Sequence, residues 1–146
     1  MGHRLLANRV GPALLALATS LGAGAATAEV VAVVSARNSA TMLSKSQVAD
    51  IFLGRALRFP DGSQAVPIDQ ADGSAARVEF YDRFSGKSQA QLNAHWSKII
   101  FTGRGQPPQE VSNSIEVKKL VIRKSNAIGY IEKNLVDGSV RVLLAE

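Results

Sequence analysis

Cysteine is absent from all 146 residues of this chain. Its absence excludes disulfide bonds, zinc–thiolate sites and thiol catalysis together. It also excludes a lipid anchor attached through an N-terminal cysteine. A domain of this kind must be held together by packing, which a hydrophobic content of 46% permits.

Clustered positive charge is also scarce, although the formal net charge is +5. The densest basic group is Lys118-Lys119 together with Arg123-Lys124, a pattern typical of a solvated helix face. Nucleic-acid binding needs a larger concentration of charge, so no nucleic-acid partner is expected. The mild basic bias suits an anionic ligand or an anionic surface.

A long apolar run occurs only near the N-terminus, between Val10 and Ala26. Arg4 and Arg9 precede it, and Ala26-Thr27-Ala28 ends it with the small-x-small pattern of a signal-peptidase site. Gly11, Pro12, Gly22 and Gly24 interrupt the run, which is short for a membrane span. An uncleaved anchor is the alternative, but no stop-transfer charge follows the run.

We therefore expect residues 1–28 to be a signal peptide and residues 29–146 to form one periplasmic domain, with no membrane insertion after cleavage. The remaining 118 residues carry a net charge of +3 and suffice for one hydrophobic core.

Hydrophobic periodicity and capping signals predict alternating strands and helices in this domain. Strands are expected at 29–35, 65–70, 127–131 and 139–144, and helices at 44–53, 74–85, 88–100 and 112–124. This order predicts a three-layer α/β domain with a mostly parallel sheet flanked by helices. The expected core side chains are Val48, Ile51, Phe52, Phe80, Tyr81, Phe84, Leu92, Trp96, Ile99, Ile100, Ile115, Val117, Leu120 and Val121.

The segment from Ala65 to Arg77 predicts a buried strand, a glycine turn and a helix that opens at Ser74. The first N–H groups of such a helix are unpaired, and the helix dipole adds positive charge there, so the junction can hold an anion. Asp72 or Ser74 can equally cap the helix internally. The candidate ligand-binding residues are Asp72, Gly73, Ser74, Ala75, Ala76 and Arg77, with Arg77 either a ligand or a solvated charge.

Other chemistry-bearing residues give weaker signals. Asp69 and Asp72 can share a proton or a metal, but no third ligand accompanies them, which favours a cap and a turn residue. His95 is interpreted as a packing residue, and the Arg104 loop as an ordinary mobile loop or an anion nest. No catalytic motif, metal or cofactor is expected, so the protein is not predicted to be an enzyme.

Three motifs resemble the phosphate-binding protein of bacterial ABC-type phosphate uptake systems. They are Leu43–Arg55, which contains Ile-Phe-Leu-Gly-Arg; Asp72-Gly-Ser74, similar to the family's phosphate loop; and Asn126–Glu132, which contains Ala-Ile-Gly-Tyr-Ile. The resemblance implies one lobe of a periplasmic binding protein-like fold. It also implies inorganic phosphate or a similar oxyanion as ligand, and a transporter as partner.

The chain departs from the family pattern at the ligand. The family's phosphate-clamping arginine is replaced within Asp69-Gln70-Ala71, and the Gly and Thr after the serine are replaced by Ala75 and Ala76. The family also closes two lobes over its anion, and this chain has room for one. We expect a weak oxyanion binder, in which tight binding needs a homodimer, a partner protein or a larger ligand. The alternative is a ligand-free partner or regulatory module of the cell envelope.

Overall fold

The computed structural model of the protein describes residues 29–143, so the expected signal peptide lies outside the described residues. A single open sheet runs through the domain in the order β3-β2-β4-β1-β5. Its strands are β1 (Val30–Ser35), β2 (Val66–Gln70), β3 (Gln109–Val111), β4 (Ala127–Glu132) and β5 (Val140–Val142).

The sheet is mixed, with β2 parallel to both β3 and β4 and β1 antiparallel to both β4 and β5. The α/β class is as predicted, whereas half of the strand pairs are antiparallel rather than most being parallel. In the sequence, α1 connects β1 to β2, an order typical of two parallel strands that lie side by side. In the structure, β4 lies between β1 and β2, so these two strands are not neighbours and β1 takes its direction from pairing with β4. The short strand β3 was not predicted.

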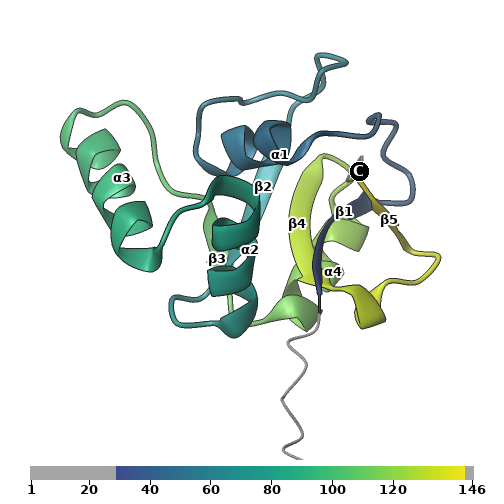
Figure 1. The fold of residues 1–146 in the computed structure, drawn as a ribbon. Helices are drawn as coiled ribbons and strands as arrows, with labels where there is room; N and C mark the ends of the chain where they lie inside the picture. Colours follow the sequence, from purple (N-terminus) through teal and green to yellow (C-terminus); the bar gives the residue numbers. More distant parts are fainter. Residues whose placement is uncertain (1–28, 144–146) are drawn as a thin grey trace, which may run out of the picture.

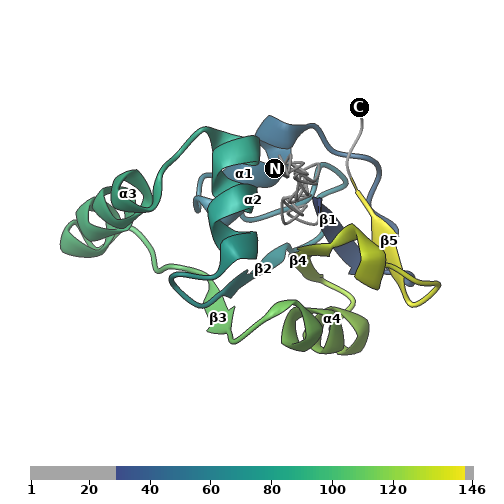
Figure 2. The same cartoon turned by 60° about the horizontal axis from the view of Figure 1, so that its bottom comes forward.

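Helices cover both faces of this sheet, which makes three layers (Figures 1 and 2). One face carries α1 and α2, and the other carries α4. The helices are α1 (Lys45–Phe52), α2 (Ala75–Ser85), α3 (Gln89–Phe101) and α4 (Ser114–Arg123), and a short 3₁₀ turn η1 (Lys133–Leu135) follows β4. Within the described residues, none of the helices has the length and apolar character needed to cross a membrane.

Local capping chemistry sets the helix starts. Ser44 and Ser88 each form a reciprocal capping box with the glutamine three residues later, as their sequences predict. Ser74 and Asn113 cap α2 and α4 through their side chains. The α2 helix ends at Gly86, whose φ of 66° is the left-handed conformation that favours glycine.

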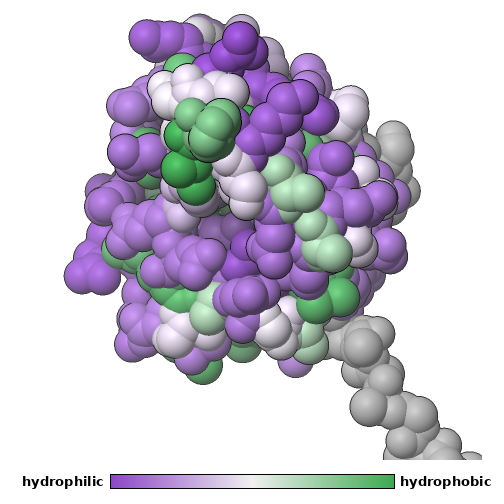
Figure 3. Space-filling view, turned by 90° about the vertical axis from the view of Figure 1, so that its left-hand side faces the viewer, coloured by the Kyte–Doolittle hydropathy of each residue, from purple (hydrophilic) through white to green (hydrophobic). Residues whose placement is uncertain are grey.

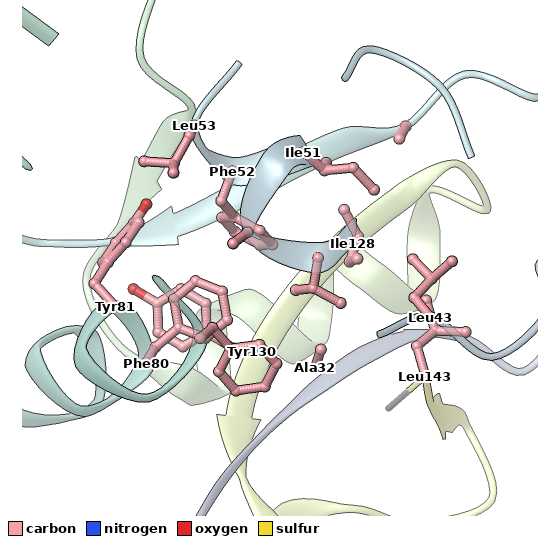
Figure 4. Close-up of a cluster of buried hydrophobic side chains, with 14 of the residues drawn as sticks. Ala32, Leu43, Ile51, Phe52, Leu53, Phe80, Tyr81, Ile128, Tyr130 and Leu143 are labelled. Atoms are coloured by element: carbon pink, nitrogen blue, oxygen red, sulfur yellow. The ribbon is translucent and has the colours of Figure 1, made fainter. Parts of the chain in front are cut away.

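An aromatic cluster fills the space between the sheet and the helices α1 and α2 (Figure 4). Phe80 stacks on Tyr130 with ring centroids 4.0 Å apart, and Phe52 meets Phe80 edge-on at 4.7 Å. All three side chains are fully buried. Burying this many rings in one place supplies much of the hydrophobic stabilisation that a chain without disulfides requires.

The opposite face is thinner because α4 packs almost directly on the sheet. Val117 and Val121 are fully buried against β4, where a Cβ on Gly129 would clash with Val117. A glycine in this strand therefore permits the close approach of the helix. Ile115, which was predicted to point inward, is 54% exposed because it lies on the solvent side of α4.

The α3 helix lies to one side of the layers (Figure 1). Leu92 and Trp96 are its buried residues, while Ile100, predicted as core, is 56% exposed and Phe101 is 92% exposed. Because α3 contacts the rest of the domain mainly through these two buried residues, the apolar residues at its C-terminal end lie outside the core. The face of the molecule on that side shows hydrophobic side chains scattered among hydrophilic ones (Figure 3).

Candidate functional site

The predicted strand–turn–helix junction exists, and it lies beyond the carboxyl end of β2. β2 ends at Gln70, Gly73 turns the chain with a φ of +83°, and α2 begins at Ala75. Only glycine adopts this φ without strain, which explains the turn at this position. The backbone N–H of Ser74 donates to Ala71 O at 3.1 Å and closes the turn.

Ser74 caps the helix, which is the internal capping that the sequence predicts as the alternative to an anion site. Its Oγ accepts a long hydrogen bond of 3.4 Å from the N–H of Arg77 and donates to Gln70 Oε1 at 3.1 Å. Within the described residues, the N–H groups of Ala75 and Ala76 have no hydrogen-bond acceptor. Two backbone donors of the predicted anion site are therefore left over after capping.

The side chain of Gln70 connects the starts of two helices. It is 1% exposed, and its Nε2 donates to Ser114 Oγ at 2.9 Å and to Tyr130 O at 3.0 Å, while its Oε1 accepts from Ser74. Ser114 opens α4, so the amide lies between the N-terminal residues of α2 and α4. A neutral side chain thus fills the space between two helix ends that would attract negative charge.

Arg77 is neither a free ligand nor a solvated charge. Its side chain is 6% exposed, and Nη1 donates to Gln70 O at 3.1 Å and to Glu110 Oε1 at 2.9 Å. Desolvation lowers the pKa of Arg77, but the nearby carboxylates of Asp69 and Glu110 outweigh it and the net shift is upward. The guanidinium is charged, and the protein's own carboxylates already balance that charge.

Asp69 is buried behind the junction, where donors surround its carboxylate. Its Oδ2 accepts from the Tyr81 hydroxyl at 2.5 Å, and its Oδ1 accepts from the Tyr130 hydroxyl and from the N–H of Gln70. Burial raises the pKa of Asp69, although the two tyrosine hydrogen bonds oppose that shift. Burial and the same carboxylate raise the pKa of both tyrosines far above the ordinary value.

This arrangement corrects the two-carboxylate interpretation. Asp69 neither caps a helix nor faces Asp72 across a metal site, whereas Asp72 is an exposed residue of the turn, as expected. In the part of the chain that the structure describes, no three acidic or histidine side chains are placed to hold a metal ion. The buried carboxylate serves the hydrogen-bond network of the core.

Carboxylates outnumber cations at this edge of the sheet. The edge holds the carboxyl ends of β2 and β4 and the start of β1, because β1 runs antiparallel to β4. Its cations are Arg77, Arg83 and Lys133, and the last two pair with Glu29. Its carboxylates are Glu29, Asp69, Asp72, Glu79, Glu110 and Glu132.

The remaining candidates lie elsewhere. His95 is half-buried with Nε2 2.9 Å from Leu53 O and its ring edge-on to Trp96, which fits a packing residue. Arg104 is exposed in the loop between α3 and β3. Lys118 and Lys119 pair with Asp137 and Glu116, as side chains of a solvated helix face do.

Taken together, these features define a class of protein: an α/β lobe with helix starts gathered at the carboxyl edge of its sheet, the place where open α/β folds bind ligands.

The sequence matches no known protein-family profile and no curated protein. Solved structures do match. A protein named as a phosphate ABC transporter substrate-binding protein, from Clostridium perfringens and with bound phosphate, superposes with a TM-score of 0.64 at 24% identity.

Two further structures agree. An ABC-type phosphate transport receptor from Vibrio cholerae gives a TM-score of 0.62 at 18% identity. PstS from Borrelia burgdorferi gives 0.60 at 15% identity. Each comparison covers 80% of this chain but only 44–47% of the other protein. The chain therefore has the fold of slightly less than half of a phosphate-binding protein, which confirms the predicted single-lobe resemblance at the level of fold.

Sequence reasoning missed the residues that close the site. Gln70 was noted only as a replacement for an arginine, and Ser114, Tyr81 and Tyr130 were not assigned to the site. A polar residue at the end of a buried strand is the available signal for Gln70. No sequence signal identifies Ser114, which is 44 residues away from its partner.

Proposed function

We propose that this chain is an exported, solute-binding-like protein that contacts phosphate or a similar oxyanion weakly at the start of α2. The observation that carries the proposal is the pair of unused N–H groups on Ala75 and Ala76 at the carboxyl edge of the sheet. Backbone donors at a helix start are a general means of holding an anion. The structural neighbours named for phosphate transport support a role beside an ABC-type transporter in the periplasm.

The same geometry explains why the binding is expected to be weak. Gln70 fills the space between two helix starts, Glu110 neutralises Arg77, and Asp72 lies in the turn itself. An arriving anion therefore gains two backbone hydrogen bonds, but the arginine that the structure places beside them is already paired. The site is also open to water, which screens charge–dipole attraction.

The proposal is one of binding rather than catalysis. The Ser74 hydroxyl donates to the Gln70 amide, and no basic side chain of residues 29–143 accepts its proton, so no described group activates it as a nucleophile. Asp69 is occupied by two tyrosines, and His95 lies against Trp96 and Leu53. These contacts support a non-enzymatic function.

A second candidate function is supported by the Gln70 network. Because the three hydrogen bonds of this amide fill the space between the two helix starts without a ligand, the lobe can serve as a partner or regulatory module of the cell envelope. Its partner would then recognise the lobe itself, with no bound anion. A second copy of the chain is one such partner.

Calorimetric titration with inorganic phosphate at low salt separates the two functions. Weak oxyanion binding predicts a dissociation constant no tighter than the high-micromolar range, equivalent to about 5–6 kcal/mol. Ala75→Pro removes one of the two N–H groups at a helix position that tolerates proline, and is expected to abolish the heat signal. Arg104→Ala is the control, since it removes a distant exposed charge.

A restored variant completes the experiment. Gln70→Arg with Ala76→Thr reinstates a guanidinium and a hydroxyl donor, and is expected to strengthen phosphate binding about tenfold or more. If neither the wild type nor the restored variant binds, the partner-module function is favoured. Nanomolar binding by the monomeric wild type would contradict the argument that one open lobe binds weakly.

A further inference from the structure

A polar depression lies at the opposite edge of the sheet, beyond the end of β1 and the starts of β2 and β4. Its volume is about 180 Å³, and every residue that lines it is polar or charged. The β1 side contributes Arg37 and Ser39, the loop before β2 contributes Gln64, and the loop before β4 contributes Ser125 and Asn126. Three loops distant in sequence thus place hydrogen-bonding side chains around one space.

Several of these side chains have donors to spare. Arg37 uses one nitrogen, Nη2, to donate to Ile122 O at 3.0 Å, which leaves the rest of its guanidinium available. The hydroxyls of Ser39 and Ser125 have no partner among the described residues, and Asn126 Nδ2 reaches Gln64 Oε1 only at 3.5 Å. A ligand that accepts hydrogen bonds can therefore be bound without breaking strong existing ones.

The charge at this edge is opposite to that around α2. Arg37 lines the depression, and Arg141 donates to the backbone of Asn38 and Ala40. The backbone of Arg58 pairs with that of Gln64, and its guanidinium donates to Gly62 O at 2.9 Å. Arg123 and Lys124 directly precede the lining residues Ser125 and Asn126. Asp61 is the carboxylate that contacts the lining, in the described part of the chain, and Ser63 donates to it. The local field favours an anion.

We propose that this depression binds a small tetrahedral oxyanion, of the size of phosphate or sulfate, at a site separate from the start of α2. Pockets for drug-sized ligands usually exceed roughly 300 Å³, so a space of about 180 Å³ suits a small ion. The guanidinium supplies paired donors that match two oxygens, and the amides and hydroxyls supply the rest. This site is independent of the proposed function, because it shares no residue with the α2 junction.

Residue-resolved NMR distinguishes the two sites in one titration. Adding sodium phosphate, or in a second arm sodium sulfate, to the ¹⁵N-labelled protein is expected to give saturable shifts at 37–39, 63–64 and 125–126. Sodium chloride at matched ionic strength is expected to give none that saturate. Arg37→Ala should weaken binding about tenfold, whereas Arg104→Ala, which removes the same charge from a distant loop, should leave it unchanged.

Gln64→Glu is the second variant, because it keeps the shape of an exposed side chain while placing a negative charge at the depression. It is expected to abolish the shifts, with the spectrum otherwise that of the folded wild type. Saturable shifts at the depression that are equally strong in Arg37→Ala and Gln64→Glu would overturn the proposal. So would shifts confined to 74–77, a result that would instead support the α2 site.

Discussion

Asp69 is a buried acidic residue whose ionisation affects the stability of the domain. Its carboxylate is 2% exposed and accepts hydrogen bonds from two tyrosine hydroxyls and one backbone N–H. Burial penalises the charged form, and the donors offset only part of that penalty, so the pKa of Asp69 is raised above 3.8. At pH values between the unfolded and the folded pKa, Asp69 therefore keeps its proton in the folded state but has lost it in the unfolded chain.

This linkage predicts a pH dependence of stability. Because the folded pKa is the higher one, the contribution of Asp69 is fully present below pH 3.8 and is lost as the pH rises through the folded pKa. Each unit of upward shift corresponds to about 1.4 kcal/mol. Urea unfolding from acid to neutral pH should show the free energy of unfolding of the wild type falling relative to Asp69→Asn. Asp72→Asn, which removes an exposed carboxylate, is the control, and parallel profiles for the wild type and Asp69→Asn would contradict the prediction.

At the scale of residues, the features that can be predicted from the sequence are those that depend on residues close together in the chain. The Ser74 cap and the Gly73 turn follow from neighbouring residues, so both could be predicted. The closing contacts of Gln70 join positions 44 and 60 residues apart, and only the packed sheet brings them together. For the same reason, the burial of Arg77 against Glu110, which is 33 residues away, could not be predicted from neighbouring residues.

The elements show a similar division between local and non-local causes. Helix starts were predictable because a serine and a glutamine three residues apart satisfy each other directly. The strand β3 was missed because its three residues, Gln109–Val111, are mostly polar and lie at the edge of the sheet. The orientation of β1 depends on which strands flank it, and the order of elements does not contain that information.

The contact between α4 and β4 predicts the effect of one added methyl group. Gly129→Ala would place a Cβ against Val117 and Val121, which leaves the helix no room, and is expected to lower the free energy of unfolding by about 1–3 kcal/mol. Val117→Ala in the same chain should recover part of the loss. Gly138→Ala is the matched control, since nothing lies within 4 Å of its new Cβ. Equal urea midpoints for the two single variants would show that the helix can shift freely.

Across the whole molecule, charge is divided between the two edges of the sheet. Carboxylates gather at the edge where α2 starts, and arginines and lysines gather at the edge where β1 ends. The net charge of the chain conceals this division, because it is a small difference between 17 basic and 12 acidic residues. An anion approaching the domain is expected to be steered toward the basic edge.

Export is the remaining prediction for the whole molecule. The pattern Ala26-Thr27-Ala28 after the apolar run predicts cleavage before Glu29. Mass spectrometry of the protein from the envelope fraction should therefore find Glu29 as the first residue. An abundant, stable, full-length protein in the cytoplasm would refute this prediction and the periplasmic role with it.

The strand order has a consequence for the newly made chain. Among the described strands, β1 pairs with β4 and β5 alone, and these partners are about 100 residues away in the sequence, as in the pair Val30–Glu132. Synthesis proceeds from the N-terminus, so this valine-rich strand is the first of the five to be made, and most of the domain must follow before it can pair. Until then it presents unsatisfied backbone groups and apolar side chains, the conditions under which strands aggregate. The pairing of β1 inside the sheet is thus completed late, and a chain stopped before residue 127 would lack both neighbours of this strand.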